Sequence, residues 1–121
     1  MKKILIVDDR REIRELVEVT LRVGNFTILQ AQSGQEAVKM TRSEKPDLIL
    51  MDVMMPGKID GFEATRILKN NPETKDCKII MLTAKGQRID REKGFSVGAD
   101  EYFSKPFSPK DLLSAVEAML E

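Results

Sequence analysis

Ile4-Leu5-Ile6-Val7-Asp8-Asp9 begins the patterned part of the chain, with four consecutive apolar residues that end in two carboxylates. Three later runs also lead to a polar residue: residues 48–51 before Asp52, residues 79–82 before Thr83, and residues 102–103 shortly before Lys105 and Pro106. Continuous apolar runs of this length are typical of strands that are buried on both faces of a parallel sheet. The sequence therefore predicts an α/β fold with polar residues at the strand ends.

The order of the predicted strands follows from how polar each run is. The first, third and fourth runs are wholly apolar and belong inside the sheet, whereas residues 26–31 include polar side chains and residues 102–103 form only a short run. We predict a five-stranded parallel sheet in the order 2-1-3-4-5, a flavodoxin-like (βα)5 three-layer sandwich. In such sheets ligands bind outside the carboxyl ends of the strands, and this order places Asp8 and Asp9 beside Asp52.

The predicted helices have their own start signals. Capping boxes are predicted at three of them: Asp9 with Glu12, Ser33 with Glu36, and Asp60 with Glu63. Ser108 followed by Pro109 predicts an N-cap with proline at the first helical position. The helix near residues 87–97 has no capping box and few apolar residues, so we expect it to be the least firmly held.

The composition limits the class of protein. The 121 residues fit one domain, 1–121, with 41% hydrophobic and 33% charged residues. Lysine plus arginine and aspartate plus glutamate number 20 each, so the formal net charge is zero and nothing predicts nucleic-acid binding by this domain. The first apolar run is too short for a signal peptide or a membrane span.

Two residue types are informative through their scarcity. Cys77 is the only cysteine, which excludes an intrachain disulfide and suits a reducing, cytoplasmic location. There is no histidine, which excludes histidine metal sites and histidine-based triads. If a phosphohistidine takes part in the function, another protein must supply it.

The residues at the strand ends suit phosphoryl chemistry. Three carboxylates in one crevice raise each other's pKa unless a cation lies among them, and oxygen ligands favour Mg²⁺. An aspartate carboxylate is also a competent nucleophile towards phosphorus. Phosphoryl transfer needs charged and hydrogen-bonding groups around the phosphoryl oxygens, and Thr83 and Lys105 would provide them.

Six segments carry a resemblance to a known family: ILIVDD at 4–9, DLILMDVMMP at 47–56, DGF at 60–62, MLTA at 81–84, GAD at 98–100 and YFSKPF at 102–107. In these segments the chain closely resembles the receiver domain of bacterial two-component response regulators, over essentially all of its length. The resemblance implies that Asp52 is the phosphoacceptor. It also implies that Asp9, Asp52 and the backbone carbonyl of Met54 bind Mg²⁺ directly, with Asp8 acting mainly through water.

The resemblance further implies a switch and a set of partners. Thr83 and Lys105 would contact the phosphoryl group, and Tyr102 would turn inward when Thr83 shifts. A sensor histidine kinase or a histidine phosphotransfer protein would donate the phosphoryl group. The changed face, built from the fourth helix, fifth strand and fifth helix, would meet an unknown target or form a phosphorylation-dependent dimer. Such a domain catalyses its own phosphorylation and dephosphorylation but is not a conventional enzyme.

Two positions depart from the family pattern. Arg10 stands where a third acidic residue is common, which predicts weaker Mg²⁺ binding by the free protein. Gly57-Lys58-Ile59 gives three residues between Met-Pro and Asp-Gly where two are usual, so the path of this loop is open.

Other functions remain as alternatives. A receiver fold could act as a docking module without phosphorylation. An aspartyl-phosphate phosphatase would need a second aspartate two residues after the nucleophile, but Arg11 and Met54 occupy those positions. A flavin-binding protein of this fold would need a glycine- and hydroxyl-rich loop in place of Asp8 and Asp9, and no P-loop sequence is present. Whether the domain acts alone or within a longer regulator is also open.

Overall fold

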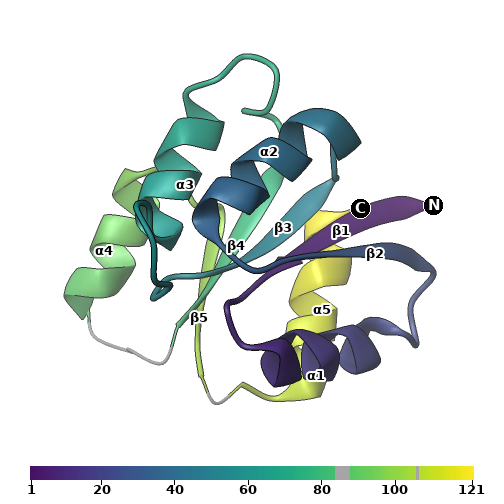
Figure 1. Ribbon diagram of the computed structural model, residues 1–121. Helices are drawn as coiled ribbons and strands as arrows, with labels where there is room; N and C mark the ends of the chain where they lie inside the picture. Colours follow the sequence, from purple (N-terminus) through teal and green to yellow (C-terminus); the bar gives the residue numbers. More distant parts are fainter. Residues whose placement is uncertain (84–87, 106) are drawn as a thin grey trace.

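The computed structural model describes residues 1–83, 88–105 and 107–121, with the side chains of 88–90 excepted. Over these ranges strands and helices alternate strictly (Figure 1). Their bounds are β1 Lys2–Val7, α1 Arg11–Leu21, β2 Phe26–Ala31, α2 Gly34–Glu44, β3 Leu48–Asp52, α3 Gly61–Lys69, β4 Lys78–Thr83, α4 Arg88–Ser96, β5 Glu101–Ser104 and α5 Pro109–Met119. No helix among the described residues is long and apolar enough to cross a membrane.

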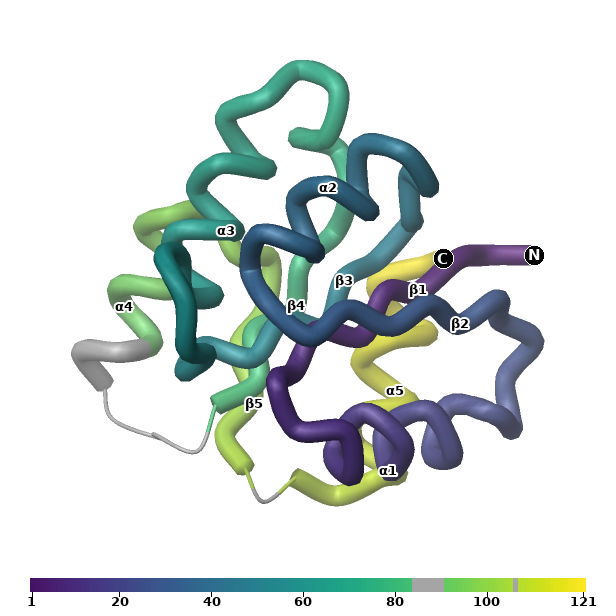
Figure 2. The backbone as a smooth tube through the Cα atoms, in the orientation of Figure 1, coloured from purple at the N-terminus to yellow at the C-terminus, as the bar shows by residue number. Residues whose placement is uncertain are grey.

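The strands form one parallel sheet in the order β2-β1-β3-β4-β5, which confirms the predicted topology. Figure 2 shows β2 outside β1, with β5 at the opposite edge. The register explains how distant residues meet. Val7 of β1 pairs with Met51 of β3, so the residues that follow them, Asp8 and Asp52, come side by side at the carboxyl ends of these strands.

Helices cover both faces of the sheet, with α1 and α5 on one face and α2, α3 and α4 on the other (Figure 1). Successive strand residues point to opposite faces, so Leu5 and Val7 join one core, whereas Ile4 and Ile6 join the other. All four side chains are almost fully buried. Burial of such a side chain stabilises the fold by roughly 1.5–3 kcal/mol, which fixes which residue of each strand faces which helix layer.

Three of the predicted helix starts are confirmed. The Ser33 Oγ accepts a hydrogen bond from the Glu36 amide at 3.1 Å, the Asp60 Oδ1 from the Glu63 amide at 2.9 Å, and the Ser108 Oγ from the Asp111 amide at 3.4 Å. The returning halves of the two capping boxes differ from expectation. Glu36 accepts from the Gln32 amide, one residue before the cap, and Glu63 pairs with Arg66 on its own helix.

The capping box predicted at Asp9 and Glu12 is wrong. Helix α1 begins at Arg11, and its N-cap residue is Arg10, whose side chain makes no capping hydrogen bond. The Arg10 amide instead donates to the Asp8 Oδ1 at 2.9 Å. The turn before the helix is thus closed by Asp8, and the Asp9 carboxylate does not cap the helix and lies near the carboxylates of Asp8 and Asp52.

Helix α4 spans Arg88–Ser96, close to the predicted 87–97, and residue 87 lies outside the described residues. The helix approaches the sheet through Gly94, where a Cβ would lie 3.1 Å from both the Met81 Sδ and the Tyr102 ring. Phe95 of the same helix is 43% exposed. Close contact at this part of α4 therefore depends on a glycine rather than on an inserted apolar side chain.

Candidate functional site

The three aspartates predicted to share a crevice do so. One carboxylate oxygen from each of Asp8, Asp9 and Asp52 lies within 4.8 Å of the other two. Asp8 and Asp52 are buried, 3% and 5% exposed, whereas Asp9 is exposed. Parallel pairing of β1 with β3 brings the carboxyl ends of these strands together, so the cluster follows from the sheet order.

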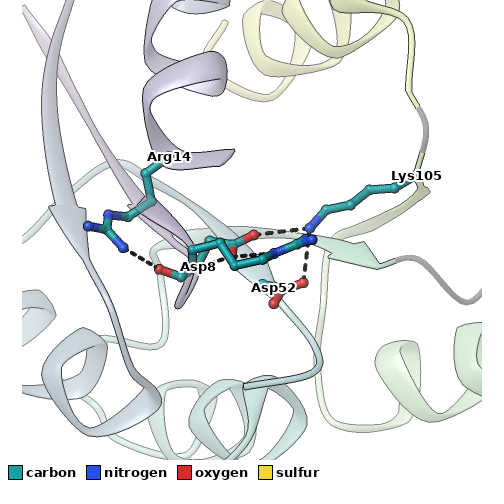
Figure 3. Close-up of polar contacts among 5 residues, drawn as sticks. Asp8, Arg14, Asp52 and Lys105 are labelled. Atoms are coloured by element: carbon teal, nitrogen blue, oxygen red, sulfur yellow. Dashed lines mark hydrogen bonds and ion pairs between the residues drawn. The ribbon is translucent and has the colours of Figure 1, made fainter. Parts of the chain in front are cut away.

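Lys105, from the turn after β5, joins the two buried aspartates. Its Nζ donates to the Asp8 Oδ2 at 3.0 Å and to the Asp52 Oδ1 at 3.1 Å (Figure 3). The backbone of Lys105 is also held, because its amide donates to the carbonyl of Thr83 at the end of β4. One ammonium group is therefore shared between two carboxylates, with a third carboxylate next to them.

Among the described residues, the three carboxylates of the cluster outnumber the cations that contact them, Lys105 and Arg10. The pKa of Asp52 is raised to about 6: burial is the largest cause, Lys105 lowers the pKa, and the charges of Asp8 and Asp9 raise it. A carboxyl whose pKa is raised in this way releases its proton more readily when another cation approaches. Because the donors are all oxygens, the cluster can hold a hard divalent cation.

An open crevice of about 280 Å³ gives access to this cluster, and it is lined by Asp9, Arg10, Asp52, Met54 and Lys105. Met54 is 56% exposed, at the position where the resemblance to receiver domains implies a metal-binding carbonyl. The role of that carbonyl stays a prediction. Arg10 lies on the same side, with its Nε 3.6 Å from the Asp8 Oδ1, so it already partly neutralises the acidic pair.

The two predicted switch residues lie on neighbouring strands. Thr83 is the last residue of β4, is fully buried, and is paired in register with Ser104 of β5. Tyr102 is 2% exposed and belongs to the core between the sheet and helices α2 to α4. The Arg91 guanidinium lies 5.5 Å from the centroid of its ring. Tyr102 therefore points inward in this structure, and its part in a switch stays a prediction.

The loop at Gly57-Lys58-Ile59, which is one residue longer than the family pattern, packs on the start of α2. Gly57 has a φ of 110°, which favours glycine, and Ile59 packs against the core. A Cβ on Gly34 would lie 2.7 Å from the Ile59 carbonyl oxygen, so only glycine lets the loop come this close. The sequence could not predict this path because it depends on two glycines from different elements.

Sequence reasoning missed two residues that support the site. A Cβ on Gly61, at the start of α3, would lie 2.1 Å from the backbone oxygen of Asp52, so a glycine is required behind the acceptor strand. On α1, the Arg14 Nη1 donates to the backbone oxygen of Asp8 at 2.8 Å (Figure 3). Gly61 was recognised only as part of a motif, and Arg14 carries no sequence signal because its contact depends on how α1 docks.

Comparison with known proteins places this geometry in a family. A family model described as the response regulator receiver domain matches residues 4–117. The chain is 46% identical over 119 residues to the phosphate regulon transcriptional regulatory protein PhoB of Pseudomonas aeruginosa, covering 98% of this chain and 52% of the relative. It is 42% identical to the alkaline phosphatase synthesis transcriptional regulatory protein PhoP of Bacillus subtilis, covering 98% of this chain and 48% of that protein.

A solved structure agrees with the sequence relatives. The chemotaxis response regulator CheY4 of Vibrio cholerae superposes with a TM-score of 0.90 at 33% identity, covering 98% of both chains. The chain spans about half the length of the curated relatives named above. The buried aspartate at the end of β3, the acidic pair after β1 and the lysine after β5 thus occur in a chain that belongs to the response regulator receiver domains of two-component signalling.

Proposed function

We propose that this receiver domain takes a phosphoryl group onto Asp52 from the phosphohistidine of a sensor kinase or histidine phosphotransfer protein. One observation carries the proposal. Asp52 is buried, has a raised pKa, and shares Lys105 with Asp8, so among the described residues the carboxylates at this site outnumber the cations that contact them. A divalent cation would be attracted by the carboxylates there, and the negative oxygens of a phosphoryl group would be attracted by that cation and by Lys105.

The transfer is a displacement at phosphorus. An Oδ of the ionised Asp52 forms the new O–P bond while the N–P bond of the donor breaks, and the electron pair stays on the imidazole nitrogen, which takes up a proton. Lys105, 3.1 Å from the Asp52 Oδ1, is placed to neutralise the charge that develops on the phosphoryl oxygens. Attack of water on the phosphorus of the acyl phosphate then breaks the O–P bond to Asp52, which restores the carboxylate and releases inorganic phosphate.

A magnesium ion suits this donor set. Asp9, Asp52 and the carbonyl of Met54 would hold it, with Asp8 acting through water. When bound, the ion would neutralise phosphoryl oxygens and orient them for in-line transfer. The three carboxylate oxygens within 4.8 Å of one another support this assignment.

We propose that the domain catalyses its own phosphorylation and dephosphorylation and does not otherwise act as an enzyme.

The output would pass through Thr83 and Tyr102 to the face formed by α4, β5 and α5. Thr83 is connected to the site because its carbonyl accepts a hydrogen bond from the Lys105 amide. Tyr102, on the adjacent strand, packs on Gly94 of α4. A shift of Thr83 towards a phosphoryl oxygen would therefore change the packing under α4, where a downstream protein or a second copy could bind.

The test is incubation with Mg²⁺ and acetyl phosphate, followed by intact mass measurement. We expect one phosphoryl adduct that hydroxylamine removes, because an acyl phosphate is cleaved by this nucleophile. Asp52→Asn should give no adduct, whereas Asp76→Asn, which changes an exposed aspartate away from the crevice, should react like the wild type. An adduct that persists in Asp52→Asn, or none in the wild type, would overturn the proposal.

A further inference from the structure

Arg14 holds the backbone of the acidic pair from outside the crevice. Its Nη1 donates to the carbonyl oxygen of Asp8 at 2.8 Å, and the amide of Asp8 donates to the Ala31 carbonyl of β2 at 3.2 Å. Both backbone polar groups of Asp8 are therefore occupied. Neither contact uses the carboxylate, which remains available to Lys105.

A line of hydrogen bonds orients the guanidinium of Arg14. The Arg14 Nε donates to the Gln30 Oε1 at 3.0 Å, and the Gln30 Nε2 donates to the Glu18 Oε1 at 2.6 Å. Glu18 in turn pairs with Arg22 one turn further along α1, at 3.4 Å. The line thus joins α1 to the edge strand β2, and it ends at the Asp8 carbonyl.

We infer that Arg14, aligned by Gln30, is a positioning residue that sets the direction of the Asp9 carboxylate and thereby the affinity of the acidic cluster for a divalent cation. The inference rests on the proposed function. Its physical basis is the planarity of the peptide bond: the Asp8 carbonyl and the amide of Asp9 lie in one plane. A hydrogen bond that fixes the orientation of the Asp8 carbonyl therefore also fixes the peptide plane that contains the amide and the Cα of Asp9.

Asp9 needs such support because its carboxylate makes no hydrogen bond or ion pair among the described residues, and its backbone is otherwise held by the turn that the Asp8 Oδ1 closes with the Arg10 amide. The residue is exposed, and it does not cap α1 as the sequence predicts. Its carboxylate nevertheless lies within 4.8 Å of those of Asp8 and Asp52. Groups that orient metal ligands from behind commonly change metal affinity by about tenfold or more when they are removed.

A purely electrostatic role for Arg14 makes the opposite prediction. Loss of a positive charge beside an acidic cluster would strengthen binding of a divalent cation. Loss of a positioning contact would weaken it. The sign of the change therefore separates the two roles, and a merely structural role would change stability without a specific effect on cation affinity.

The experiment is a titration with Mn²⁺ followed by electron paramagnetic resonance, with Mg²⁺ as competitor, because Mn²⁺ also prefers oxygen ligands. Unfolding by urea is measured on the same proteins. We compare the wild type with Arg14→Ala, Arg14→Lys and Gln30→Leu. Arg11→Ala is the matched control, since Arg11 lies on the same helix and pairs only with Glu15 in the described contacts.

We expect Arg14→Ala to bind Mn²⁺ about tenfold more weakly, Arg14→Lys to show a smaller loss, and Arg11→Ala to bind like the wild type. Gln30→Leu should lose affinity by about threefold with no change of charge. Unchanged or tighter binding by Arg14→Ala would overturn the inference. If Arg14→Ala does not fold, Gln30→Leu decides in the same way. A wild type that binds neither ion would instead overturn the proposed function.

Discussion

Two clusters in which a lysine meets an aspartate, among the residues that the structure describes, lie at opposite ends of the sheet. At the carboxyl ends of the strands, Lys105 is shared between Asp8 and Asp52. Near the amino end of β4, Lys69 meets Asp100 at 2.9 Å. Both lysines are mostly buried, with 12% and 15% of the side chain exposed, so burial does not distinguish them.

The difference lies in how completely the polar groups are satisfied. The Lys69 Nζ donates to the Asp100 Oδ2 at 2.9 Å and also to the backbone oxygens of Lys75 and Cys77. All three donors of the ammonium are used, and Asp100 also accepts from the amide of Ile79. This pair is balanced in charge, whereas Lys105 faces a group of three carboxylates. The balanced cluster stabilises the fold, and the unbalanced one is suited to receive a cation.

Replacing each lysine by methionine tests this difference, and it should produce the largest effect. Lys69→Met leaves the Asp100 carboxylate and two backbone carbonyls without their hydrogen-bond donor. We expect the free energy of unfolding to fall by about 2 kcal/mol. This is less than for a fully buried ion pair, because the site is partly exposed. Urea unfolding at pH 7.5 in EDTA measures the loss. Lys105→Met leaves the buried carboxylates of Asp8 and Asp52 without their donor, so in EDTA it should lose at least as much.

Magnesium provides the control for this pair of variants. A cation that binds only the folded state adds stability according to its affinity. Lys105→Met should therefore be stabilised by millimolar Mg²⁺ at least as much as the wild type. Lys69→Met should gain no more than the wild type. A larger gain for Lys69→Met would contradict the division between the two clusters.

Replacing Asp52 or Asp100 by asparagine should change the free energy of unfolding in opposite directions. Because the pKa of Asp52 is raised from 3.8 to about 6 in the folded protein, this group stabilises the fold at low pH and loses that contribution as the pH rises through about 6. Asp52→Asn removes the buried charge. We expect it to be more stable than the wild type by about 1–2 kcal/mol above pH 6, with the difference shrinking towards pH 4.

Asp100→Asn should instead destabilise the protein at neutral pH, because Lys69 loses the charge that balances it. Thermal unfolding of both variants in EDTA, from pH 4 to pH 8, gives the comparison. Equal changes of the same sign in the two variants would show that the clusters do not differ in charge balance.

Arg10→Glu should produce the smallest effect. The Arg10 Nε lies 3.6 Å from the Asp8 Oδ1 and its side chain is half exposed, so the pair is worth little, as exposed ion pairs generally are. We expect Mg²⁺ to bind about threefold more tightly by calorimetric titration. Arg11→Glu makes the same charge change one residue away, where the side chain is 81% exposed, and should tighten binding less.

The strand pattern predicted most of the fold because continuous apolar runs can be buried only inside a covered sheet. The order of the strands, the convergence of Asp8, Asp9 and Asp52, and three helix caps followed from local chemistry and were confirmed. The cap at Asp9 was wrong because a capping signal does not show which of two neighbouring aspartates will close the turn. Here Asp8 accepts from the Arg10 amide.

The sequence by itself therefore determined the layers, the strand order and the identity of the acidic residues, since these depend on periodicity and on residue type. Only the tertiary structure decided which charges are balanced. Lys105 and Asp8 are separated by 97 positions, and Lys69 and Asp100 by 31, so no local pattern couples them. The contact of Arg14 with the Asp8 carbonyl is decided in the same way, by the docking of α1 against the ends of β1 and β2.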